Sequence, residues 1–135
     1  MRAKSLTVEQ VLVLHRNILG IYDDGLLPNG EHLLESALSR PESSYGGVQL
    51  FDSTFKKAAA LLEGIIQNHP FQDGNKRTAY NSAVILLRLH GYRLMCYVSD
   101  EEQADFVVSI ARKQRKYDDI VRWIDRHFTK APPLT

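Results

Sequence analysis

Residues 55–90 read FKKAAALLEGIIQNHPFQDGNKRTAYNSAVILLRLH, two helical patterns separated by a short break, and this stretch decides the fold. Its first half repeats apolar residues at intervals of three and four, the spacing of one helix face. These residues are Phe55, Ala58, Ala59, Leu62, Ile65 and Ile66. Its second half, from about Asn75 to His90, is apolar over most of its circumference, which is typical of a helix surrounded by others. Two packed central helices of an all-α domain are therefore predicted.

Pro70 marks the break between these helices. A proline cannot occupy a helix interior, and it moves the preceding residue, here His69, away from helical dihedral angles. The first central helix is therefore predicted to end near Asn68, and the second to open at Asp73 or Gly74. A helix start presents unpaired backbone N–H groups and a partial positive charge, so it attracts anions.

Shorter helices are predicted on either side. A hydroxyl residue followed three positions later by Gln or Glu fits a capping box. This pattern occurs at Thr7 with Gln10, which opens a helix to about Gly20, and at Ser99 with Glu102.

Other local patterns complete the outline. Asn29 is placed to cap a short helix over residues 31–39, and Gly91 to end the second central helix. Residues 92–98 favour a short strand, and the composition of residues 43–48 favours a loop or small hairpin. The last helix carries apolar residues at helical spacing: Ile120, Val121, Ile124 and Phe128.

Length and composition narrow the class of protein. The 135 residues fit one domain over residues 1–130 with a short tail at 131–135, and the net charge of +1 gives no support for direct nucleic-acid binding. The single Cys96 can form neither an internal disulfide nor a cysteine-based zinc site, which favours a reducing compartment. The longest apolar run, residues 83–87, is far too short to span a bilayer. A soluble cytoplasmic protein without membrane contact is expected.

The break also concentrates chemistry. A histidine (His69), a carboxylate (Asp73), two cations (Lys76 and Arg77) and a helix terminus opened by Gly74 fall within nine residues. Cations are unfavourable at a helix N-terminus, and a bound anion would offset that repulsion. Phosphoryl transfer needs a general base, a Mg²⁺ ligand and an anion cradle, and this set supplies all three. The segment is not a Walker A loop, because the position five before Gly74 is His69 rather than glycine.

Each of these residues also has an ordinary explanation. Asp73 could be a helix N-cap, His69 a helix-end histidine, Asn75 a turn residue, and Lys76 and Arg77 solvated surface charges. A non-catalytic adaptor that binds a phosphorylated or acidic partner at this helix start stays open. A metal-dependent hydrolase using His69 and Asp73 is disfavoured, because the remaining histidines lack ligand-like spacing.

The stretch from His69 to Arg77 resembles the signature of the Fic/Doc (Fido) family, His-Pro-Phe-x-Asp/Glu-Gly-Asn-Gly/Lys-Arg, with every specified position filled. The resemblance implies a compact bundle of about six helices with a small flap hairpin. It also implies transfer of part of a nucleotide to a protein hydroxyl. By this likeness His69 would take the proton from that hydroxyl, Asp73 would hold Mg²⁺, and Phe71 would anchor the loop in the core. The implied phosphate-binding residues are Gly74, Asn75, Lys76 and Arg77. The implied target-docking flap comprises Ser43, Ser44, Tyr45, Gly46, Gly47 and Val48.

Two departures point toward the Doc branch. Members that transfer AMP usually carry glycine where this chain has Lys76, and a second arginine where it has Tyr80. In Doc-like toxins a lysine at the first position goes with a reversed nucleotide. The implied reaction is transfer of the γ-phosphate of ATP, with Mg²⁺, to a threonine of translation elongation factor Tu, which arrests translation. AMP transfer is the alternative.

The family's self-inhibitory motif, Ser/Thr-x-x-x-Glu-Gly/Asn, is missing. The Glu-Gly pair at Glu63 and Gly64 has Ala59 where the motif needs a hydroxyl. A separate antitoxin of the Phd type is therefore expected, its C-terminal segment folding as it binds this domain.

Overall fold

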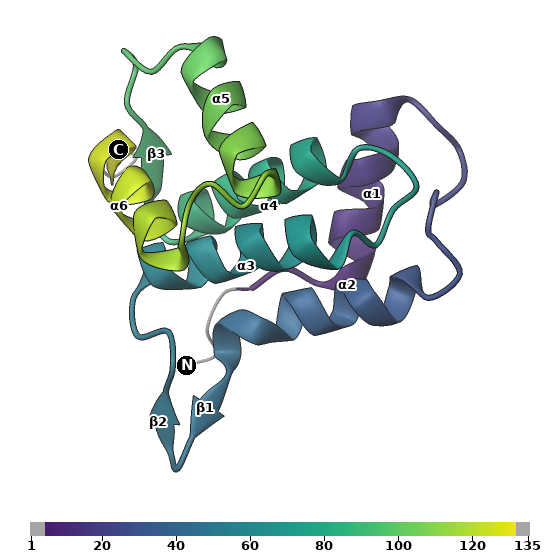
Figure 1. Ribbon diagram of the computed structural model, residues 1–135, viewed down its shortest axis with the longest axis horizontal. Coiled ribbons are helices and arrows are strands. Elements are labelled where there is room, and N and C mark those ends of the chain that lie inside the picture. Colours follow the sequence, from purple (N-terminus) through teal and green to yellow (C-terminus); the bar gives the residue numbers. More distant parts are fainter. Residues whose placement is uncertain (1–4, 132–135) are drawn as a thin grey trace.

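The computed structural model describes residues 5–131, and the predicted set of six helices is confirmed (Figure 1). They are α1 (Val8–Leu19), α2 (Gly30–Ser39), α3 (Thr54–Asn68), α4 (Asn75–Leu89), α5 (Asp100–Ala111) and α6 (Tyr117–His127), with a 3-10 turn, η1 (Arg40–Glu42), after α2. Two small antiparallel pairs accompany them, β1 (Ser44–Tyr45) with β2 (Val48–Gln49) and β3 (Tyr92–Leu94) with β4 (Phe128–Lys130). All but the first residue of the predicted tail lies outside the described part of the chain.

Helix α3 is the centre of the core. Helices α2, α4 and α6 all pack against it (Figure 1). Small residues allow this close approach: Ala58, Ala59 and Ala60 are fully buried, and Gly64 lies against Ala37 of α2. The central apolar face predicted from the sequence is therefore the main packing surface.

The predicted capping boxes are present. The Thr7 hydroxyl accepts from the Gln10 N–H at 3.2 Å, while the Gln10 amide oxygen accepts from the Thr7 N–H at 2.9 Å. Ser99 and Glu102 are paired in the same way. Gly20 ends α1 in the left-handed conformation, at φ 67°.

The start of α2 differs from the prediction. The helix begins at Gly30, and the Asn29 side chain makes no capping hydrogen bond. A methyl group on Gly30 would lie 2.3 Å from the carbonyl oxygen of Pro70. Glycine is required because two backbones meet there, a contact that links α2 to the segment after α3.

The C-terminal end corrects one expectation. Phe128 does not continue the last helix: it is extended, at φ −117° and ψ 145°, and begins β4 opposite Leu94. The Met95 N–H donates to the His127 carbonyl at 2.8 Å across this junction. The prediction was wrong because a buried ring suits a helix face and a strand equally well. Of the strand expected over residues 92–98, only the first three residues form one.

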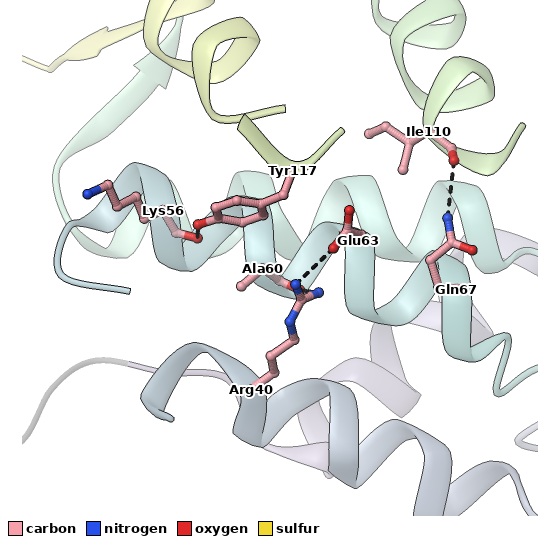
Figure 2. A network of polar contacts seen from close by, with 7 residues as sticks. All are labelled: Arg40, Lys56, Ala60, Glu63, Gln67, Ile110 and Tyr117. Carbon is pink, nitrogen blue, oxygen red and sulfur yellow. Dashed lines mark hydrogen bonds and ion pairs between the residues drawn. The ribbon is translucent and has the colours of Figure 1, made fainter. Parts of the chain in front are cut away.

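Arg40 ties η1 to α3 (Figure 2). Its guanidinium donates to the Glu63 carboxylate at 2.8 Å and to the Ala60 carbonyl at 3.2 Å, and it lies over the ring of Tyr117. The Tyr117 hydroxyl in turn donates to the Lys56 carbonyl at 2.8 Å. Burial raises the pKa of Tyr117 to about 12, so the phenol remains a neutral donor. This network joins η1, α3 and α6.

Replacing Arg40 with alanine is expected to lower the free energy of unfolding by about 2 kcal/mol, because Glu63 loses its charged partner and the stem packing disappears. The side chains of Arg40 and Glu63 are 34% and 21% exposed, respectively. Urea denaturation measures the change, and Lys56→Ala is the matched control. The Lys56–Asp52 pair has side chains 47% and 69% exposed, so its loss should cost much less than the loss of Arg40. Equal effects would contradict a structural role for Arg40.

Within residues 5–131, no helix is both long and apolar enough to cross a membrane.

Candidate functional site

The loop between α3 and α4, residues 69–74, begins and ends where the sequence indicated. His69 terminates α3 in the left-handed region, at φ 52° and ψ 59°, and its N–H still donates to the Ile65 carbonyl at 3.0 Å. Gly74 opens α4 at φ 78°, and the Thr78 N–H donates to its carbonyl at 2.9 Å. The chain therefore changes direction at His69 and again at Gly74, and both residues adopt left-handed backbone conformations.

The loop is held from outside by the segment that joins α1 to α2. The Leu27 N–H donates to the Pro70 carbonyl at 3.0 Å, and the Gln72 N–H donates to the Gly25 carbonyl at 2.8 Å. Between these two bonds, Leu26 pairs with Phe71 as an isolated antiparallel bridge. The loop therefore has strand-like pairing along one side.

Phe71 and Asn75 close the loop from inside. The Phe71 N–H donates to the Asn75 side-chain oxygen at 2.9 Å, and the Asn75 amide donates back to the Phe71 carbonyl at 2.8 Å. The Phe71 ring, expected to anchor the loop, is fully buried. We call this pair of bonds the Phe71–Asn75 clamp. Because the clamp engages the Asn75 side chain, Asn75 can bind a ligand through its backbone N–H.

The charged residues of the motif face solvent. His69, Asp73, Lys76 and Arg77 are all exposed. One Asp73 carboxylate oxygen, Oδ1, accepts from the Gly74 N–H at 2.7 Å, and the N-cap position of α4 belongs to Gly74, not to Asp73. The first N–H groups of a helix have no carbonyl partner within it. At the start of α4 they lie beside two cations, an arrangement suited to an anion.

Asp73 is the carboxylate of the motif that could contribute to a magnesium site. Within residues 5–131, no group of three or more His, Cys, Asp or Glu side chains could hold a metal ion. Mg²⁺ commonly binds one or two carboxylates and completes its shell with waters and substrate phosphates. Asp73 is exposed, and its Oδ2 is not engaged by the Gly74 N–H. This single carboxylate oxygen fits a Mg²⁺ ion whose other ligands are mainly nucleotide phosphates and water.

A pocket of about 190 Å³ adjoins the cations, between α4 and α5. The surface exposed to the pocket is mostly apolar, because the polar residues contribute mainly carbon atoms to it. The lining residues are Lys76, Arg77, Tyr80, Asn81, Gln103, Ala104, Val107 and Val108. The Tyr80 hydroxyl donates to the Gln103 side-chain oxygen at 2.7 Å, and burial raises the pKa of Tyr80, so the phenol stays neutral. The sequence analysis missed this pocket because no local pattern pairs α4 with α5.

The structure does not bring the predicted flap next to His69. Residues 43–48 form the expected hairpin, but it lies at the opposite end of α3 from the loop (Figure 1). Fifteen residues of helix separate them, about 22 Å at 1.5 Å per residue. A polar groove of about 430 Å³ between α2 and α3 reaches from Ser43 to Asn68, the neighbour of His69. Target docking on the hairpin stays a prediction.

One residue of the site was missed altogether. His15 of α1 is fully buried, stacks on the Phe71 ring and lies within hydrogen-bond distance of the Asp73 carbonyl. Its position three and four residues after Leu12 and Val11, on the apolar stripe of α1, was the available signal.

The fold and loop together define a helical domain with an anion-attracting helix start, flanked by a histidine and a carboxylate. The chain belongs to the Fic/DOC family, whose model matches residues 5–87 and so includes the whole motif. It is 34% identical over 88 residues to the protein named Toxin Doc from Mycolicibacterium smegmatis, covering 65% of this chain and 68% of that protein. It is 26% identical over 130 residues to Protein kinase doc of Escherichia phage P1, covering 95% of this chain and 98% of that protein.

Proposed function

We propose that this chain is the toxin of a toxin–antitoxin system and a Mg²⁺-dependent protein kinase acting in the cytoplasm. The reaction is transfer of the ATP γ-phosphate to a protein hydroxyl. The observation that carries the proposal is the start of α4, where unpaired N–H groups, Lys76 and Arg77 adjoin His69 and Asp73. Similarity to a phage protein named as a kinase extends over 95% of this chain.

Each motif residue has a role in this reaction. His69 accepts the proton as the acceptor oxygen bonds to the γ-phosphorus and the bond to the β,γ-bridging oxygen breaks, which releases ADP. The N–H groups of Asn75, Lys76 and Arg77, with the two cationic side chains, hold phosphate oxygens. Mg²⁺ held by Asp73 would neutralise charge on the phosphates. The Phe71–Asn75 clamp holds the loop and the start of α4 in a fixed arrangement.

Two features favour γ-phosphate transfer over AMP transfer. Lys76 places an ammonium group at the first turn of α4, where members of the family that transfer AMP usually carry glycine. Tyr80 replaces a second arginine and its hydroxyl is engaged by Gln103, so the pocket lacks a cation there for a further phosphate.

The proposed target is a threonine of elongation factor Tu, whose modification would arrest translation. A Phd-like antitoxin would restrain the enzyme. The need for a separate antitoxin is supported by Glu63, the glutamate of the Glu-Gly pair in this chain. It is paired with Arg40 between α2 and α3, so it is not free to act as a self-inhibitory glutamate.

Label from ATP tests the reaction. Purified protein, elongation factor Tu, Mg²⁺ and ATP labelled at either the α- or the γ-phosphate are incubated, and label on the factor is measured. We expect transfer from the γ-position alone, with a mass increment of one phosphate group. Label from the α-position would show AMP transfer instead. No label from either position would contradict this target.

A further inference from the structure

His15 supports the loop from beneath. Its imidazole is fully buried and lies flat on the Phe71 ring, with centroids 3.7 Å apart and planes 9° from parallel. Its Nε2 is 2.8 Å from the backbone carbonyl oxygen of Asp73, which is 58 positions away in sequence. A carbonyl oxygen only accepts, so Nε2 carries the hydrogen, and in the neutral imidazole Nδ1 is then the bare nitrogen.

This histidine is a poor choice for packing alone. In the described structure Nδ1 is buried and has no hydrogen-bond partner. A buried acceptor without a partner disfavours folding, and an apolar side chain would avoid that cost. A residue that breaks a folding rule beside a candidate site indicates a functional contribution. The contribution visible here is the bond to Asp73.

That bond constrains a flexible peptide. Gly74 follows Asp73 at φ 78°, and glycine resists rotation of the preceding peptide less than any other residue. His15 holds the Asp73 carbonyl, and the Gly74 N–H holds Oδ1 of the carboxylate. Leu19, one helical turn beyond His15, backs Gly74 from the same helix. Two of the three Asp73 oxygens are thus fixed by hydrogen bonds. The third, Oδ2, is left for the proposed contact with Mg²⁺.

We infer that His15 is a positioning residue, which sets the Asp73 carboxylate through its backbone so that Oδ2 meets phosphate-bound Mg²⁺. The inference rests on the proposed function for the role of Asp73. The geometric part, control of the Asp73–Gly74 peptide by α1, can be tested without any nucleotide.

Two substitutions of matched shape isolate the hydrogen bond. Glutamine and methionine are similar in length, and both remove the ring stacked on Phe71. His15→Gln keeps an N–H donor at about the place of Nε2, whereas His15→Met has none. Thermal unfolding of both variants checks that they fold, and the comparison between them cancels the loss of stacking.

The first measurement uses NMR on the protein alone. We expect the wild-type His15 ring to carry its hydrogen on Nε2. The Gly74 amide resonance should shift in His15→Met and stay near its wild-type position in His15→Gln. Hydrogen on Nδ1, or equal Gly74 shifts in the two variants, would overturn the inference.

The second measurement is calorimetric titration of ATP at increasing Mg²⁺ concentrations. Loss of an outer-shell partner typically weakens metal binding by 10- to 100-fold, so His15→Met should need at least about tenfold more Mg²⁺, and His15→Gln less than about threefold more. Equal Mg²⁺ requirements in the two variants would overturn the inference. If the wild-type protein binds no Mg²⁺–ATP, the proposed function fails, and the NMR comparison alone decides the role of His15.

Discussion

Replacing His69 with asparagine should lower the rate of γ-phosphate transfer by a factor of about 10² to 10⁴, the range that a positioned general base contributes. His69 is exposed at the end of α3 in the left-handed region, at φ 52°. Asparagine tolerates this conformation, so the loop should keep its shape while the imidazole is lost. Initial rates of label transfer measure the loss, and calorimetry should show ATP binding nearly unchanged.

The control for this substitution is His32→Asn, at an exposed position of α2. It removes a second exposed imidazole, one outside the nine-residue motif, and should leave transfer at the wild-type rate. If cells expressing His69→Asn still stop growing, catalysis would not be the cause of arrest. That outcome would favour the adaptor that binds an acidic or phosphorylated partner at the same helix start.

Asn75→Ala should be the most damaging change that leaves the charged residues of the motif intact. It removes both bonds of the Phe71–Asn75 clamp and leaves a buried N–H and carbonyl of Phe71 without partners. At about 1–3 kcal/mol for each of these two groups, the free energy of unfolding should fall by about 2–6 kcal/mol. Urea denaturation measures this. ATP binding should weaken as well, because the loop that presents the α4 terminus loosens.

Asn81→Ala provides the comparison on the same helix. The Asn81 amide also donates to a backbone carbonyl, that of Arg77 at 2.8 Å, but this bond is exposed to solvent. Water replaces such a bond at little cost, so the free energy of unfolding should change by less than about 1 kcal/mol. If both alanine variants lose the same stability, burial of the clamp is not what makes it important.

The sequence predicted features that depend on neighbouring residues. Pro70 stops α3 wherever the rest of the chain lies, because the clash and the missing N–H are local. The capping boxes at Thr7 and Ser99 are equally local, since donor and acceptor are three residues apart. The nine-residue motif needed no fold to be recognised. These are the parts of the fold and site that could be read directly.

Features that depend on distant partners were beyond such reading. Strand β4 exists because Phe128 meets Leu94, a pairing that no local periodicity encodes. His15 looked like one more residue on an amphipathic helix, and only its contact with Asp73 distinguishes it. The hairpin at residues 43–48 was predicted by composition, but its distance from His69 is set by the length of α3.

The contact between Gly30 and the Pro70 carbonyl bears on how diverged members of this family can be recognised. Because a methyl group there would sit 2.3 Å from an oxygen, any descendant chain that keeps this arrangement is confined to glycine at that point. Position 30 is therefore a landmark outside the nine-residue signature. Chains whose signature has decayed but which retain glycine at the start of the second helix are candidates for having kept the ancestral shape after losing the chemistry.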